Sequence, residues 1–250
     1  MLNSIRLCQA LNEKICHDFA GAIGIIDNSV DLIRTTAYQE KATKLIQDST
    51  NRLISYLEFY RYLYSLPSED NKISIVEINR LATNFLKSKN HNVELLFTRL
   101  PSTTINEHIA QIIICLIVIA SNNLSKNAII KVELEIQHDK LTGMKIVVID
   151  TNLKFDHDRI DILLGKGIIE DVYSNDLKNW NVKQGVSVLG VQLVHEHANA
   201  PRFYGANSSK HSSITIENVH EYYTYYLIME YGYKLLVTPL IDSVEYNLLF

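Results

Sequence analysis

Residues 8–33 read CQALNEKICHDFAGAIGIIDNSVDLI, and their apolar side chains recur at steps of three or four. This spacing is typical of one face of an α-helix. The face comprises Cys8, Leu11, Ile15, Phe19, Ile23, Ile26, Val30 and Ile33. The pattern predicts one long amphipathic helix over residues 3–33.

His17 lies off this apolar face, two residues from both Ile15 and Phe19. At about 100° per residue it stands roughly 200° from each, so its imidazole is expected to face solvent. The same outer side is expected to carry Lys14, Ala20, Gly21, Gly24 and Asn28. A glycine within a helix costs about 1 kcal/mol relative to alanine, and here two of them leave bare backbone beside the histidine. This favours a docking face for a partner; close packing of a neighbouring helix is the alternative.

A second helix is predicted over residues 39–63, because apolar positions again follow helical spacing. They are Ala42, Leu45, Ile46, Ser49, Leu53, Leu57, Tyr60 and Tyr64. The two helices form a hairpin domain over residues 1–66. A hairpin cannot bury both apolar faces by itself, so we expect a homodimer in which two hairpins form a four-helix bundle.

Residues 67–71, PSEDN, combine a proline with polar turn formers and are the clearest linker in the chain. The second domain, residues 72–250, mixes helical and strand patterns. Helices are expected at residues 75–86, 105–120 and 219–231, and strands at 93–98, 129–136, 145–149, 233–238 and 244–249. Residues 186–197 are a further helix candidate, which competes with residues 219–231 for the main helix. The expected fold class is α+β, with helices layered on one face of a mainly antiparallel sheet.

Composition and the lengths of the apolar runs limit the classes of protein to which the chain can belong. The chain of 250 residues has 24 basic and 28 acidic side chains and a net charge of −4, which argues against a nucleic-acid module. The most apolar run, residues 109–120, is too short to cross a bilayer, and the N-terminus lacks the pattern of a signal peptide. The three cysteines have neither metal-site nor disulfide spacing. We expect a cytoplasmic protein without membrane contact.

The hairpin with Cys16-His17-Asp18 on its first helix, followed by an α+β sandwich, resembles the core of sensor histidine kinases. More closely, it resembles the ChpT-type histidine phosphotransferases, in which a Cys-His-Asp run is followed by small residues, a glycine and an asparagine. The chain departs from the kinase pattern at Ala22, where kinases carry proline. The resemblance implies that His17 is the phosphoacceptor and that the second domain is a degenerate kinase-type (Bergerat-like) ATP-binding domain.

Three boxes that bind nucleotide in the kinases are altered here. The two asparagines of the asparagine box, one of which holds Mg²⁺, correspond to Cys115 and Ile119, and neither side chain suits a hard cation. In the first glycine box Asp150 is present, but Asn152 and Lys154 replace both glycines. The second glycine box, at residues 188–191, retains one glycine. The resemblance therefore implies a phosphotransferase that does not bind ATP.

Without ATP, His17 would receive its phosphoryl group from an aspartyl phosphate on the receiver domain of a hybrid histidine kinase and pass it to response regulators. The receiver would supply Mg²⁺, so the chain needs no cofactor or metal of its own. Asp18 either supports the imidazole or is a solvated helix charge, and Lys14 could contact a phosphoryl oxygen. The residues expected to contact the receiver are Ala20, Gly21, Gly24 and Asn28.

Three other functions stay open at this point. The first is an active histidine kinase that uses ATP. The second is a metal-dependent phosphohydrolase, suggested by the dipeptide His17-Asp18, although neither His91 nor Asp150 lies in a ligand motif. The third is a non-catalytic dimer that uses the tyrosine-rich residues 56–64 and 222–233 as interaction surfaces.

Overall fold

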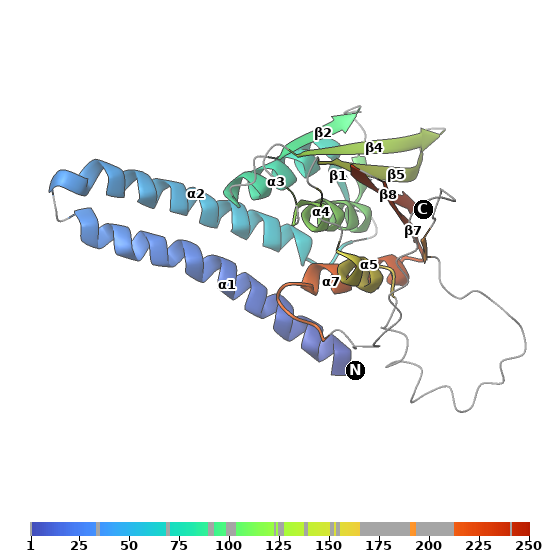
Figure 1. The fold of residues 1–250 in the computed structure, drawn as a ribbon, viewed down its shortest axis with the longest axis horizontal. Coiled ribbons are helices and arrows are strands. Elements are labelled where there is room, and N and C mark those ends of the chain that lie inside the picture. Colours follow the sequence, from blue (N-terminus) through green and yellow to red (C-terminus); the bar gives the residue numbers. More distant parts are fainter. Residues whose placement is uncertain are drawn as a thin grey trace, which may run out of the picture.

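The computed structural model describes residues 2–33, 36–68, 71–89, 93–98, 104–122, 124, 128–137, 140–150, 153, 156–165, 191–193, 213–240 and 242–250. Its N-terminal part is a helical hairpin of α1 (Leu2–Ile33), a short 3₁₀ turn (Thr36–Tyr38) and α2 (Gln39–Leu63). Figure 1 shows these two helices side by side, extending well beyond the rest of the molecule. Both helices agree with the bounds that the apolar spacing predicts.

Small side chains of both helices are buried in the hairpin. Ala22 and Ser29 of α1 and Ala42 and Ser49 of α2 are all buried. Small residues let two helix backbones approach closely. Among the larger apolar side chains of α1, Phe19 packs against the rings of Tyr56 and Tyr60 of α2, whereas Ile23 is 54% exposed. The apolar stripe of α1 is thus only partly buried within the single chain.

The second part of the chain is built on a six-stranded sheet with the order β2-β4-β5-β8-β7-β6. Its strands are β2 (Glu94–Thr98), β4 (Ile129–Gln137), β5 (Lys140–Ile149), β6 (Val191–Leu193), β7 (Lys234–Pro239) and β8 (Ser243–Leu249). Three pairs are antiparallel, while β2–β4 and β6–β7 are parallel. A separate antiparallel pair joins β1 (Lys72–Ser74) to β3 (Thr104–Asn106). The sheet is thus mixed and mainly antiparallel.

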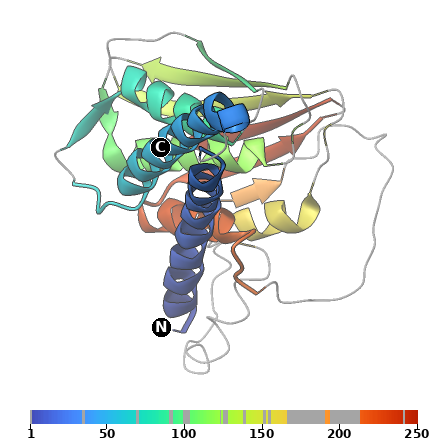
Figure 2. The same cartoon turned by 90° about the vertical axis from the view of Figure 1, so that its left-hand side faces the viewer.

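Within the described residues, four helices accompany the sheet: α3 (Ile75–Ser88), α4 (Glu107–Ser121), α5 (His157–Leu163) and α7 (Val219–Glu230). Figure 2 shows β4 and β5 above α4, with α7 below it. Helix α4 contacts several strands, including β4 and β5, and also contacts α7. Nearly every side chain from His108 to Ser121 is therefore buried. This explains its uniformly apolar sequence. Helix α3 begins at Ser74, whose hydroxyl accepts a hydrogen bond from the Glu77 backbone N–H.

The predicted helix at residues 186–197 is wrong for the part that the structure describes. Of residues 186–197, those described form the strand Val191–Leu193, which pairs in parallel with β7; the others lie outside the described residues. The helix at Val219–Glu230 is present, and Gly232, with φ of +69°, follows its end. A positive φ suits glycine, which has no Cβ. The strands β1 and β3 and the helix α5 were not expected from the sequence.

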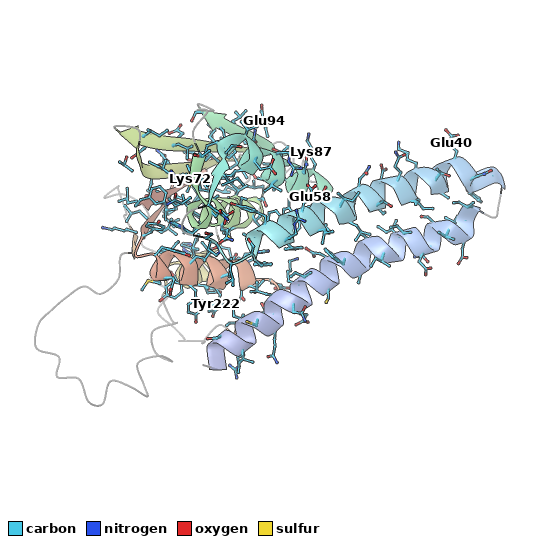
Figure 3. All side chains as sticks on the ribbon, turned by 180° about the vertical axis from the view of Figure 1, so that it is seen from behind. Glu40, Glu58, Lys72, Lys87, Glu94 and Tyr222 are labelled. Atoms are coloured by element: carbon cyan, nitrogen blue, oxygen red, sulfur yellow. The ribbon has the colours of Figure 1, made fainter. Side chains whose placement is uncertain are left out.

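The base of the hairpin shares its core with the second part of the chain. The Phe59 ring of α2 stacks on the Phe85 ring of α3 with centroids 3.6 Å apart. Arg80 of α3 donates to the Glu58 carboxylate at 2.8 Å, and Figure 3 labels Glu58 where α2 passes α3. Ile15 and Phe19 of α1 pack against the same core. The hairpin base is consequently tied to the helices of the second part.

Candidate functional site

His17 projects from α1 near the base of the hairpin, and its side chain is 67% exposed. Its neighbours Ile15 and Phe19 pack toward the core, so the imidazole lies on the other side of the helix. The Nδ1 atom lies 3.3 Å from Oδ1 of Asp18. An ionised carboxylate can only accept a hydrogen bond, so this geometry favours a proton on Nδ1 and an unprotonated Nε2.

Asp18 is buried although it directly follows an exposed histidine; its side chain is only 8% exposed. Oδ1 accepts a hydrogen bond from Nζ of Lys14 at 2.8 Å. Oδ2 accepts one from the Tyr60 hydroxyl at 2.5 Å and lies 3.6 Å from Nζ of Lys89. Of the two expectations for Asp18, the solvated helix charge is therefore wrong, because the carboxylate is enclosed by donors from α1, α2 and the end of α3.

The electrostatics of this cluster keep Asp18 ionised. Burial by itself raises the pKa of a carboxyl group. Here the charge of Lys89 and the hydrogen bonds from Lys14 and Tyr60 outweigh burial and lower the pKa of Asp18 to about 2. Burial, reinforced by the charge of Asp18, raises the pKa of Tyr60 well above its ordinary value, so Tyr60 stays a neutral donor.

Lys89 is the contribution of the second part of the chain to this site. It caps the C-terminus of α3, and its ammonium lies 4.8 Å from the centroid of the Phe85 ring. Burial lowers the pKa of Lys89 to about 8, although the charge of Asp18 opposes this shift. Helical spacing gives Tyr60 only as an apolar position and does not indicate Lys89. The contacts join distant parts of the chain, so no local spacing signals them.

The Lys14 side chain does not extend to the outer face of α1 where it was expected. Its side chain is largely buried, and its ammonium binds Asp18. The expectation that Lys14 shares the open outer face with His17 is therefore corrected. In this structure the ammonium is engaged by a carboxylate rather than presented to solvent.

The small residues after His17 leave the surface open. Ala20, Gly21 and Asn28 are exposed, and Gly24 is half-buried. A methyl group built on Gly21 or on Gly24 would have no described atom within 4 Å, apart from its own helix turn. The surface here is bare helix backbone that a second protein could approach closely.

The residues aligned with the kinase nucleotide boxes lie in the interior where they are described. Cys115 is fully buried in α4, and burial raises the pKa of its thiol to about 12. Ile119 and Asp150 are also buried. Asn152, Lys154 and residues 188–190 fall outside the described residues. At the two positions where the resemblance to the kinases expects asparagine, the structure thus has a buried thiol and a buried alkyl side chain.

No family model matches the sequence, and no curated protein does. Among solved structures, a bacterial phosphotransferase determined at 1.7 Å matches with a TM-score of 0.69 and 17% sequence identity, over 99% of this chain and 98% of its own. The chain has the fold of that phosphotransferase. The expected fold class, a helical hairpin followed by an α+β domain, is thereby confirmed.

Histidine kinases also match, at lower similarity. The histidine kinase AdeS of Acinetobacter baumannii has a TM-score of 0.42 and 11% identity, over 93% of this chain and 95% of its own. The catalytic domain of the histidine kinase ThkA has a TM-score of 0.38 and 12% identity, over 71% of this chain and 92% of its own.

Two kinds of feature are absent from the described ranges. In them, no three His, Cys, Asp or Glu side chains gather in a way that could hold a metal ion. No helix in the same ranges has the length and apolar character needed to span a membrane.

Proposed function

We propose that this chain is a histidine phosphotransferase of a bacterial phosphorelay, acting in the cytoplasm. His17 accepts a phosphoryl group from an aspartyl phosphate on the receiver domain of a hybrid histidine kinase and passes it to an aspartate of a response regulator. The observation that carries the proposal is the pairing of an exposed imidazole with a buried, ionised carboxylate. The His17 side chain is 67% exposed, and its Nδ1 atom lies 3.3 Å from Oδ1 of Asp18.

This pairing suits in-line transfer. The Nε2 lone pair attacks phosphorus, an N–P bond forms, and the bond from phosphorus to the aspartyl oxygen breaks to release a carboxylate. The Nδ1 proton stays on the ring, which gains positive charge as the bond forms. The adjacent Asp18 carboxylate stabilises that charge, as an aspartate does for the imidazolium of a catalytic triad. The reverse sequence returns the phosphoryl group to a second receiver.

The open surface after His17 supports receiver docking. Gly21 and Gly24 leave the helix backbone bare, and the exposed Ala20 and Asn28 flank it. A receiver that brings its own Mg²⁺ needs close approach of its acidic pocket to Nε2, and a bulky side chain would prevent this approach. We assign the receiver contact to these four residues.

The exposed apolar side chains of the hairpin support a homodimer. Ile23 and Val30 on α1 and Ile54 and Leu57 on α2 are each about half exposed in the single chain. Exposed apolar residues repeated along two neighbouring helices are typical of an interface between copies. We propose that two hairpins pair through them into a four-helix bundle.

The proposed activity does not use ATP. The side chains of Cys115 and Ile119 lack the oxygen ligands that Mg²⁺ prefers. The second domain then acts as a structural support for the hairpin, and the phosphoryl group comes from another protein.

A reconstituted transfer tests the proposal. A receiver domain carrying a labelled aspartyl phosphate is mixed with the wild-type chain, with His17→Ala, or with His157→Ala, which removes another exposed histidine. Wild type and His157→Ala should take up acid-labile label, whereas His17→Ala should stay unlabelled. Equal labelling of His17→Ala would contradict the proposal.

A further inference from the structure

The two oxygens of the Asp18 carboxylate have different neighbours. Oδ1 faces Nδ1 of His17 and the ammonium of Lys14, both on α1. Oδ2 faces the Tyr60 hydroxyl of α2 and the ammonium of Lys89 at the end of α3. The carboxylate thus bridges the exposed histidine and two residues from other helices.

This bridging is not a property of an isolated helix. Residues i and i+1 project about 100° apart on a helix and do not face each other. A free Asp18 would therefore exchange among rotamers, most of which turn away from the imidazole. The contacts to Oδ2 from Tyr60 and Lys89, together with the bond from Lys14 to Oδ1, restrict these rotamers and favour the one in which Oδ1 lies 3.3 Å from Nδ1.

We infer that Tyr60 and Lys89 are positioning residues for His17: they fix the Asp18 carboxylate so that the imidazole keeps its proton on Nδ1 and presents Nε2 to phosphorus. This inference rests on the proposed phosphotransfer function and names two residues that act through Asp18. Neither of them touches the phosphoryl group.

Both residues are themselves held in place. The Tyr60 ring is buried and packs edge-on against Phe59 and Phe85, with centroids 5.4 Å and 5.9 Å apart, and stacks on Tyr64 at 5.7 Å. Lys89 is 17% exposed and lies over the Phe85 ring. Fixed donors lose little side-chain freedom when they bind the carboxylate, which makes the orientation of Asp18 well defined.

Through Lys89, the second part of the chain also helps to position His17, and this role does not require bound nucleotide. Because Phe85 and Lys89 belong to α3 and its cap, the packing of α3 against α2 places the ammonium at Asp18. The second domain is thus required for an ordered site even if it binds no ATP.

The test separates a positioning role from a structural one. The variant Tyr60→Phe removes the hydroxyl and keeps the ring, and Lys89→Met removes the charged end and keeps an unbranched side chain that is one atom shorter. Tyr64→Phe is the matched control, because its hydroxyl faces His220 at 3.4 Å. Lys89→Arg keeps the positive charge and serves as the rescue. Two readouts are taken: the ¹⁵N shifts of the His17 ring and the single-turnover rate of label uptake from a phosphorylated receiver.

The expected result is a shift of the His17 ring in Tyr60→Phe and Lys89→Met toward the tautomer protonated at Nε2, with uptake about tenfold slower, since a hydrogen bond to a charged group is lost. Tyr64→Phe and Lys89→Arg should keep the wild-type tautomer. Folded Tyr60→Phe with wild-type tautomer and rate would overturn the inference, as would slow uptake with an unchanged tautomer. Failure of the wild type to take up label would instead count against the proposed function, and the tautomer measurement would still decide the positioning role.

Discussion

Oδ1 of Asp18 lies 3.3 Å from Nδ1 of His17, its immediate neighbour on α1. Adjacent residues of a helix do not normally face each other, so this contact depends on tertiary structure. The donors that hold the other carboxylate oxygen come from α2 and from the end of α3. The exposed histidine is thereby coupled to the packing of the hairpin base.

Replacing Asp18 by asparagine should slow phosphotransfer by at least about tenfold. The amide keeps the shape of the side chain but loses the negative charge that stabilises the ring during transfer. A hydrogen bond to a charged group contributes roughly 1.5–3 kcal/mol. Single-turnover uptake from a phosphorylated receiver measures the effect. Asp27→Asn, at an exposed position of the same helix, is the control. Equal rates for the two variants would contradict the role of Asp18.

Asp18 should also contribute to stability in a pH-dependent way. Its pKa falls from an ordinary 3.8 to about 2 in the folded chain, so the unfolded state binds the proton more tightly. The stabilisation is therefore full above about pH 4 and is lost as the pH falls through about 2, with a total of about 2 kcal/mol. Urea unfolding at pH 5 and pH 2 should show that Asp18→Asn loses about that much less than the wild type. Parallel losses in both proteins would show that Asp18 is not held in this way.

The predictability of the fold differs between its parts. Helices α1 and α2 are long and strongly periodic, and the buried run of α4 is uninterrupted, so spacing alone locates all three. Residues 186–197 form a short apolar segment, for which helix and strand patterns are difficult to distinguish. Its described part, Val191–Leu193, is a strand because it pairs with β7, which is a long-range interaction.

The candidate site was predictable only in part. Helical spacing places His17 opposite Ile15 and Phe19, and its side chain is exposed. The same spacing cannot reveal that Asp18 is buried, because its enclosure depends on Tyr60 and Lys89, which are distant in sequence. It also cannot show which members of the apolar stripe are buried: Phe19 packs against Tyr56 and Tyr60, whereas Ile23 is 54% exposed.

Charges in the exposed apolar surface of the hairpin should separate the proposed dimer. Leu57 is 57% exposed in the single chain, and Ile23 is similarly exposed. Burial of such side chains contributes about 1.5–3 kcal/mol each, and a lysine there adds the cost of desolvating a charge. Sedimentation of Ile23→Lys/Leu57→Lys should give a monomer. Leu66→Lys, at a position 95% exposed in the loop after α2, should remain dimeric. A wild-type chain that sediments as a monomer would refute the dimer.

Replacing Gly21 should have opposite effects on stability and on transfer. Leucine removes a helix-interior glycine, which is worth roughly 0.5–1 kcal/mol of stability, and the space around the position is open. The same side chain should obstruct a receiver and reduce uptake of label. Gly21→Ala is the matched control, since it gains stability with little added bulk. Normal uptake by a folded Gly21→Leu would exclude this face as the docking surface.

Calorimetric titration with Mg²⁺ and ATP should give no saturable binding. By the resemblance to the kinases, Cys115 and Ile119 take the positions of the asparagine box, and their side chains offer no oxygen ligand. Incubation with labelled ATP should likewise leave His17 unlabelled. A saturable isotherm, or labelling from ATP that disappears in His17→Ala, would identify a histidine kinase instead.

The most direct measurement is a transfer between two receivers in the absence of ATP. The chain is labelled by one phosphorylated receiver domain, purified, and then mixed with a second, unphosphorylated receiver. The account predicts that acid-labile label on His17 decreases while label on the second receiver rises by the same amount, and that His17→Ala carries nothing between them. Transfer through His17→Ala at the wild-type rate, or label retained on the wild-type chain in the presence of functional receivers, would contradict it.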